Sequence, residues 1–359
     1  MKRNSSPHLA YLDGWRGLAI IVVLFAHFQH ETFKWAGSLG VQLFFVLSGY
    51  LMGGLLFIKE VPLTDFFARR LSRILPTFLV FVALMALYAA TLQPKPYSVP
   101  FGEFLSTLAF ARTYFPADVS INAGTWQIGH LWSLNVEEHS YVLLACGALV
   151  VRMLGRKDAA LVFLWLSVLA VLCVTLYYPA HLPDGASPWH RRSEAAALGL
   201  LASAAYRTTL SRASIAWLEN PWPLLPLLSL AVAVFCYWIF AWHGSAQPVL
   251  KYTIAPLLLA YSINHLAQAP ALMRRALSSR ILCWFGTCSF SLYLWQQPFD
   301  QAFRALKLPA LPMLAGALVC GAVSFYCLEN PLRLYLNEKW ATRKQQRLIE
   351  DEEPAPVGL

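Results

Sequence analysis

The sequence has little charge: Asp, Glu, Lys and Arg make up only 13% of its 359 residues, whereas hydrophobic residues make up 58%. A water-soluble domain carries about twice that charged fraction. Because so much apolar surface needs the bilayer as its solvent, this deficit excludes a single aqueous core. The sequence therefore predicts an all-α, polytopic bundle of membrane-spanning helices, embedded in lipid.

Three further absences narrow the class. The seven cysteines show no CxxC spacing, so neither a zinc site nor a disulfide framework is expected. The first apolar run lacks a small-residue cleavage site and carries Arg16 and His27, so it is expected to remain as a membrane helix. The net charge of +9 does not indicate a nucleic-acid partner, because Lys and Arg are clustered between apolar runs. We therefore expect no metal and no nucleic acid.

A membrane span needs about 20 mostly apolar residues, and ten stretches qualify. The sixth is the weakest, since it is short and opens with Arg191, Arg192 and Glu194. The predicted spans are residues 15–35, 39–58, 74–92, 130–151, 159–178, 190–206, 222–242, 252–268, 284–303 and 310–330.

The distribution of Lys and Arg predicts the orientation. Most of the 28 basic residues fall in alternate connecting segments and in the two terminal segments. By the positive-inside rule, both termini are then cytoplasmic and the chain is a multi-pass protein of a bacterial inner membrane. We expect a membrane domain over residues 1–333 with a periplasmic loop at 93–129 that forms a partly ordered cap. A partly disordered cytoplasmic tail is expected over residues 334–359.

Ionisable residues inside apolar runs are the candidates for function, because each costs several kcal/mol unless it faces a cavity or a partner. The first span holds Asp13, Arg16 and His27. A helix turns about 100° per residue, so all three share a face, with His27 about 16 Å above Arg16 and near the bilayer midplane. The competing interpretation is that Asp13 and Arg16 only anchor the helix at the surface and that His27 only bonds a neighbouring helix.

The fourth span supplies two adjacent carboxylates, Glu137 and Glu138. Glu137 is expected about 10 Å deep, level with His27, where it would orient the imidazole as a general base. Only one of the two can point directly at His27, and we favour Glu137. The basic loop after the second span holds Arg69, Arg70 and Arg73, which suit either lipid headgroups or a phosphorylated cosubstrate.

With these residues in place, the sequence resembles the acyltransferase 3 family of membrane acyltransferases. The resemblance extends over nearly the whole chain and rests on six motifs in family order. They are residues 12–17 (LDGWRG) with the Arg16-x10-His27 spacing, 40–50 (GVQLFFVLSGY), 69–76 (RRLSRILP), 131–141 (LWSLNVEEHSY), 285–298 (FGTCSFSLYLWQQP) and 329–331 (ENP). The chain departs from the family at Gln42, at His139-Ser140 and at Gln296, where the family has Asp, Gln-Phe and His.

The resemblance implies a membrane O-acyltransferase of the stand-alone form, which uses acyl-CoA (acetyl-CoA first) from the cytoplasm. The acceptor would be a hydroxyl of an extracytoplasmic glycan such as O-antigen or exopolysaccharide. We predict that His27 is the base and that Arg16, Arg69, Arg70 and Arg73 hold the donor. The residues predicted to bind substrate are Trp132, Glu138, Tyr141, Arg192, Tyr293, Gln296 and Glu329.

Two other classes are compatible with buried charges along a pathway. A secondary transporter or flippase of a glycan or lipid-linked precursor should show inverted repeats, which are not evident in the sequence. A non-catalytic assembly protein would lose stability, not turnover, when His27 is replaced by alanine. The acceptor, the acyl group and the oligomeric state are not encoded in any feature of the sequence that we identified.

Overall fold

The computed structural model describes residues 9–29, 31–93, 97–116, 126–181, 189–212, 221–240 and 249–352. Within these ranges the chain is helical and forms no strand, which confirms the predicted all-α class. The remaining residues, including parts of the expected cap and the end of the expected tail, lie outside the described part of the chain.

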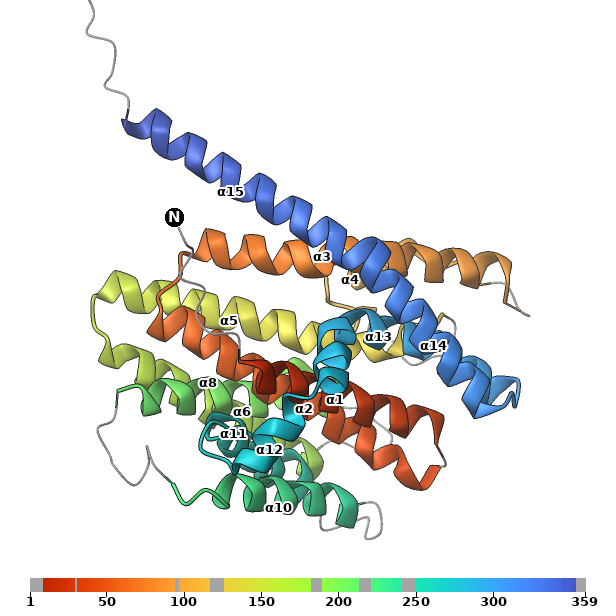
Figure 1. Cartoon of the computed structure of the whole chain (residues 1–359), viewed down its shortest axis with the longest axis horizontal. Helices are drawn as coiled ribbons and strands as arrows, with labels where there is room; N and C mark the ends of the chain where they lie inside the picture. The colour runs from red at the N-terminus through yellow and green to blue at the C-terminus, as the bar shows by residue number, and fades with distance from the viewer. Residues whose placement is uncertain are drawn as a thin grey trace, which may run out of the picture.

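Each of the ten predicted spans contains a helix, although the boundaries differ. The helices are α1 (Ala10–Phe28), α2 (Lys34–Gly53), α3 (Leu63–Thr91), α4 (Phe101–Leu108), α5 (Trp132–Leu154), α6 (Asp158–His181), α7 (Ser193–Ala196), α8 (Leu198–Leu210), α10 (Leu225–Phe240), α11 (Ala255–Asn264), α12 (Ala271–Leu277), α13 (Arg280–Ala305), α14 (Ala310–Ser324) and α15 (Asn330–Glu352). They form one bundle with most axes roughly aligned, from which α15 extends obliquely (Figure 1).

Six helical segments are long and apolar enough to cross a membrane by length and composition. They comprise α1, α2 with its π-helical end, α3, α5 with its preceding turn, α6, and the continuous helix from α14 into α15. The other predicted spans correspond to shorter helices or, for α13, to a 26-residue helix that carries more polar residues. The chain is therefore a polytopic membrane protein, as its composition predicted.

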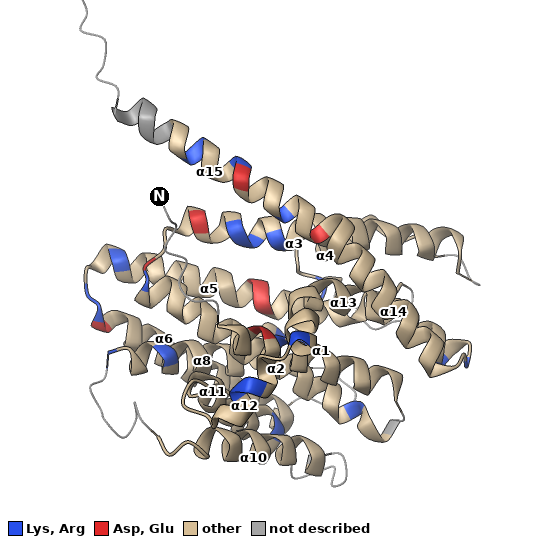
Figure 2. Cartoon of the chain, viewed as in Figure 1, with Lys and Arg blue, Asp and Glu red and all other residues tan. Residues whose placement is uncertain are grey.

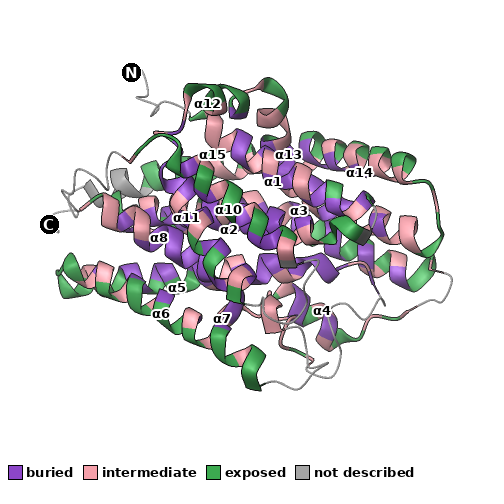
Figure 3. Cartoon of the chain, turned by 90° about the horizontal axis from the view of Figure 1, so that it is seen from below, coloured by how far each residue is buried: buried purple, intermediate pink, exposed green. Residues whose placement is uncertain are grey.

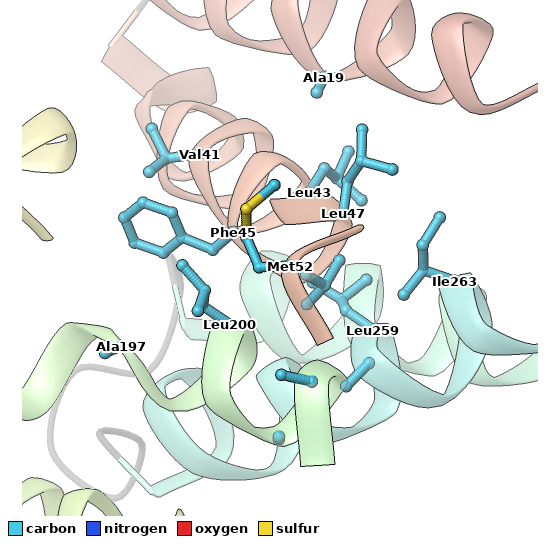
Figure 4. Packing of buried hydrophobic residues seen from close by; sticks show 14 of the residues in the cluster. Ala19, Val41, Leu43, Phe45, Leu47, Met52, Ala197, Leu200, Leu259 and Ile263 are labelled. Atoms are coloured by element: carbon cyan, nitrogen blue, oxygen red, sulfur yellow. The ribbon is translucent and has the colours of Figure 1, made fainter. Parts of the chain in front are cut away.

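The core lies at the centre of the bundle, where α1 and α2 are enclosed by α8, α11 and α13 (Figure 3). In Figure 4, Leu47 of α2 points toward the helix that carries Ala19, whereas Leu200 and Leu259 come from the helices on the other side of α2. Side chains that face outward on α6 and α14 stay apolar and exposed, as lipid contact requires.

Glycine residues allow a close crossing of α1 and α13. A Cβ atom on Gly286 of α13 would lie 1.9 Å from the carbonyl oxygen of Asp13, and one on Gly17 would lie 1.9 Å from that of Leu282. The backbones of α1 and α13 thus touch, as small residues allow in membrane bundles. This contact sets the position of Asp13 and Arg16 relative to the rest of the bundle.

The end of α1 differs from its prediction. The span was expected to run from residue 15 to 35, but the helix begins at Ala10 and ends at Phe28. Gln29 is extended, and a polar turn follows before α2 begins at Lys34. His27 is therefore in the last turn of α1 and not at mid-helix, because the polar residues after Phe28 end the helix earlier than hydropathy suggested.

The C-terminal boundary also differs. The predicted boundary at residue 333 lies inside α15, which packs along α3 through Asp65–Lys344 at 2.6 Å and Ser72–Asn337 at 2.9 Å. The expected cap contains α4 and a buried ion pair, Glu103–Arg112, at 3.0 Å. In Figure 2, basic residues gather in the left half of the bundle, on the first part of α3 and around the α5–α6 connection.

Candidate functional site

Between α1, α2, α3, α5 and α13 lies a cavity of about 140 Å³, which we call the arginine cavity because Arg16, Arg70 and Arg73 line it. Glu137 and Tyr141 contribute from α5, and the rest of its wall is largely apolar. Residues from five of the six family motifs therefore meet here although they are far apart in the sequence.

Arg70 is the most extensively bonded of these cations. Its Nη2 donates to Glu138 Oε1 at 2.9 Å and to Glu137 Oε2 at 3.4 Å, and its Nε donates to Glu138 at 3.1 Å. The guanidinium stacks on the ring of Tyr141, with Cζ 3.3 Å from the ring centre. Two carboxylates and a ring face thus satisfy this buried charge and hold it rigidly.

Arg16 and Arg73 form fewer hydrogen bonds and ion pairs than Arg70. Arg16 Nη1 donates to Asp13 Oδ1 at 3.3 Å, one helical turn away, as two residues on the same helix face can do. Arg73 makes no hydrogen bond or ion pair with any residue that the structure describes, although it faces the cavity. A guanidinium left open in a cavity is suited to bind an anionic group.

A second cavity, of about 320 Å³, lies toward the other end of α1, and we call it the histidine cavity. His27, His130 and His190 line it, together with Trp132, Arg191 and other polar side chains. The structure thus brings His27 and Trp132 together, whereas Arg16 lies in the arginine cavity, about three turns of α1 away.

The predicted pairing of His27 with Glu137 is wrong. His27 Nδ1 lies 2.8 Å from the carbonyl oxygen of Val23, whereas Glu137 is bonded to Ser48 Oγ at 2.8 Å and to Arg70. A carbonyl oxygen only accepts, so Nδ1 carries the proton and Nε2 keeps its lone pair in the neutral ring. The helix backbone orients the imidazole in place of a carboxylate.

His130 is a candidate that sequence reasoning passed over. It is 5% exposed, lines the histidine cavity, and has no hydrogen-bond partner at either ring nitrogen within the described chain. Its place directly before the 131–141 motif was the available signal. Its carbonyl oxygen accepts from Tyr293 Oη at 2.7 Å, which fixes the start of α5.

The two cavities meet at Tyr293 and Val41, which line both of them. Tyr293 Oη also lies 2.6 Å from Ser133 Oγ, so the ring is fixed from two sides. Tyr293, which was predicted to bind substrate, thus forms part of the boundary between the two cavities.

Other predicted residues lie away from the cavities. Arg69 is exposed and lines a separate groove against α15, since it is turned about 100° from Arg70. Arg192 pairs with Glu194 at 2.5 Å, while its neighbour Arg191 lines the histidine cavity. Gln296 and Glu329 are buried outside both linings, and Glu329 accepts from Ser291 at 2.6 Å.

Glu138 acts on the site only through Arg70, whereas Tyr141 lines the arginine cavity directly. In the described part of the chain, no group of three or more His, Cys, Asp or Glu side chains is placed to hold a metal ion. The site as built is a set of arginines at one end and histidines at the other.

The fold and the site define a polytopic membrane protein whose helical bundle encloses two cavities with Tyr293 and Val41 in common, one lined by arginines and the other by histidines. The chain belongs to the acyltransferase 3 family, whose acyltransferase domain matches residues 9–328. This match confirms the resemblance found in its motifs.

The chain is similar to three curated relatives. It is 25% identical to the peptidoglycan O-acetyltransferase OatA of Listeria monocytogenes, over 92% of this chain and 57% of that protein. It is 25% identical to the putative peptidoglycan O-acetyltransferase YrhL of Bacillus subtilis, over 92% of this chain and 56% of that protein. It is 22% identical to the O-acetyltransferase OatA of Staphylococcus aureus, over 92% of this chain and 58% of that protein. The chain thus spans a little over half the length of these relatives. No solved structure matches it.

Proposed function

We propose that this protein transfers an acyl group, acetyl in the first instance, from acyl-CoA to a hydroxyl of a cell-surface glycan. The observation that carries the proposal is the pair of neighbouring cavities that share Tyr293 and Val41 in their linings. One is lined by arginines and the other by histidines, so a charged donor and a hydroxyl acceptor each have a matching chamber.

The arginine cavity suits the donor. Arg16 and Arg73 face a space whose remaining wall includes Phe44, Phe45 and Phe290. Guanidinium groups bind phosphate oxygens, and the apolar wall suits the pantetheine arm and the acyl chain. Basic residues gather at the same end of the bundle, so we assign this cavity to the cytoplasmic side of the inner membrane.

His27 is the proposed base. Its free Nε2 takes the proton from the acceptor hydroxyl while the hydroxyl oxygen attacks the thioester carbonyl carbon. The carbon–sulfur bond breaks, CoA leaves as the thiolate, and the imidazolium returns the proton to that sulfur. The products are an O-acyl glycan and free CoA, so the step needs no further reactant.

The acceptor enters from the periplasmic side in this proposal. The relatives whose names specify an acceptor act on peptidoglycan, so the peptidoglycan glycan strand is the first acceptor to test. O-antigen and exopolysaccharide carry equivalent hydroxyls and are the next candidates.

The test compares cells that carry the gene with cells that lack it. Peptidoglycan, lipopolysaccharide and exopolysaccharide are isolated and analysed by mass spectrometry before and after mild alkali. We expect one of them to lose an alkali-labile acetyl group on deletion and to regain it with the wild-type gene but not with His27→Ala. Identical spectra for all three glycans in the two strains would overturn the proposal.

A further inference from the structure

Arg191 occupies an unusual place in the histidine cavity. It lies in the short turn before α7, and its guanidinium is 6.0 Å from the ring centre of Trp132. No carboxylate and no hydrogen-bond acceptor contacts it in the part of the chain that the structure describes, although it is only partly exposed. A cation held in such a place without a counter-charge is ready to bind an anion.

The other charges of the cavity do not neutralise Arg191. Two more cations, Lys34 and Arg304, line the same cavity. Among the lining residues that the structure describes, the single carboxylate is Asp300, which accepts from Arg304 Nε at 2.8 Å. Cations therefore outnumber carboxylates in the described lining, where an acceptor would lie.

A further cation, Lys251, adds positive charge close to the aromatic rings that line the cavity. The Nζ of Lys251 lies 5.0 Å from the ring centre of Tyr252 and 5.8 Å from that of Tyr237, and both rings line the cavity. Tyr252 also stacks on His190, with ring centres 5.4 Å apart. The cavity thus combines aromatic faces, which pack against sugar rings, with cations that attract a negative group.

From this arrangement we infer that the acceptor carries a carboxylate or a phosphate, which Arg191 binds next to the hydroxyl that is acylated. Uncharged glycans are then poor acceptors. The inference rests on the proposed function, because it assigns the histidine cavity to the acceptor. Bidentate binding by the planar guanidinium also orients the sugar, which lysine at the same position would do less well.

The experiment uses the full chain reconstituted in lipid, with acetyl-CoA as donor and two matched probes. One probe is an oligosaccharide of alternating N-acetylglucosamine and N-acetylmuramic acid, and the other is the same oligosaccharide with its carboxylates methyl-esterified. We expect a KM at least about tenfold lower for the free acid, since a hydrogen bond to a charged group accounts for about that factor.

Arg191→Gln should raise the KM for the free acid about 10- to 100-fold and leave the KM for the ester unchanged. Arg191→Lys should fall between the two, and Lys307→Gln, an exposed cation at the α13–α14 turn, is the control that should change neither value. A third probe, a ribitol phosphate oligomer, separates the two anion classes: if its KM also depends on Arg191, phosphate is accepted as well as carboxylate.

Binding of the same probes to protein without donor separates this inference from the proposed function. Charge-selective binding that Arg191→Gln abolishes, without acylation of any probe, would support the anion site and contradict acyl transfer. Equal binding and equal KM for acid and ester would overturn the anion site and leave acyl transfer standing.

Discussion

His27 Nδ1 lies 2.8 Å from the carbonyl oxygen of Val23, one turn earlier in α1. Helix geometry alone provides this contact, so the ring is oriented without a carboxylate partner. The carbonyl oxygen of His27 in turn accepts from Arg304 Nη2 at 2.8 Å, which holds the last turn of α1 to α13. One contact therefore orients the imidazole ring and the other holds the backbone of His27 in place. Nε2 of the ring is left to act as a base.

Replacing His27 should remove turnover without unfolding the protein. Because His27→Ala deletes the proposed base, we expect acyl transfer to fall by about 10²- to 10⁴-fold. His181→Ala is the matched control, since His181 is exposed and, among the described residues, forms its hydrogen bond with the carbonyl of Tyr177. Transfer rates in detergent-solubilised protein of equal monodispersity provide the readout, and full activity of His27→Ala would show that His27 is not the base.

Arg73 and Arg69 should respond differently to the same substitution. Arg73 faces the arginine cavity and has no hydrogen-bond or ion-pair partner among the described residues, so Arg73→Gln should raise the KM for acyl-CoA about 10- to 100-fold. Arg69 lines a separate exposed groove, so Arg69→Gln should leave that KM within about twofold. Equal effects of the two substitutions would mean that overall positive charge, and not the cavity, attracts the donor.

The contact between α1 and α13 should be intolerant of any side chain. Gly286→Ala places a Cβ atom 1.9 Å from the carbonyl oxygen of Asp13, and backbone cannot move aside cheaply, so we expect a loss of at least about 2 kcal/mol. Gly54→Ala meets nothing within 4 Å and should be neutral or stabilising. The measurement is the thermal unfolding of both variants in the same detergent. A Gly286→Ala protein as stable as the parent would contradict the close backbone contact between α1 and α13.

The buried pair Glu103–Arg112 should hold the cap together. Each partner is 2% exposed, and Tyr97 Oη also donates to Glu103 at 2.7 Å. Arg112→Met leaves a buried carboxylate without its cation, which typically costs about 3–5 kcal/mol. Protease cleavage within residues 97–116 should therefore accelerate.

Combining Arg112→Met with Glu103→Gln removes the buried charge and should restore most of the protection. A single variant that resists protease as well as the double variant would show that the ion pair does not maintain the cap.

Hydropathy was sufficient to predict the helical membrane bundle. The positions of the charged residues along the chain were sufficient to predict that Asp13 and Arg16 share one helix face. Asp13 and Arg16 are three residues apart on a helix, so their contact followed from helical geometry alone. The six ordered motifs also identified the family. These features are local, or depend only on composition, and a single sequence contains them.

Long-range geometry was not accessible in the same way. The predicted partner of His27 was Glu137, but the cation that reaches Glu137 comes from α3, 67 residues away in the chain. The choice between Arg191 and Arg192 depended on where a short turn begins, because adjacent side chains point in different directions. His130 was passed over because a histidine at a helix entrance looks like an interface residue until both of its ring nitrogens are found without partners.

The central claim is that a donor from one side of the membrane acylates an acceptor from the other through His27. It is tested most directly in sealed proteoliposomes of uniform protein orientation, with isotopically labelled acetyl-CoA inside and the oligosaccharide outside. The account predicts labelled, alkali-labile acetyl esters on the external glycan with wild-type protein and at least about a hundredfold less with His27→Ala. Label that stays on CoA with the wild-type protein, or that reaches the glycan equally well without His27, would contradict it.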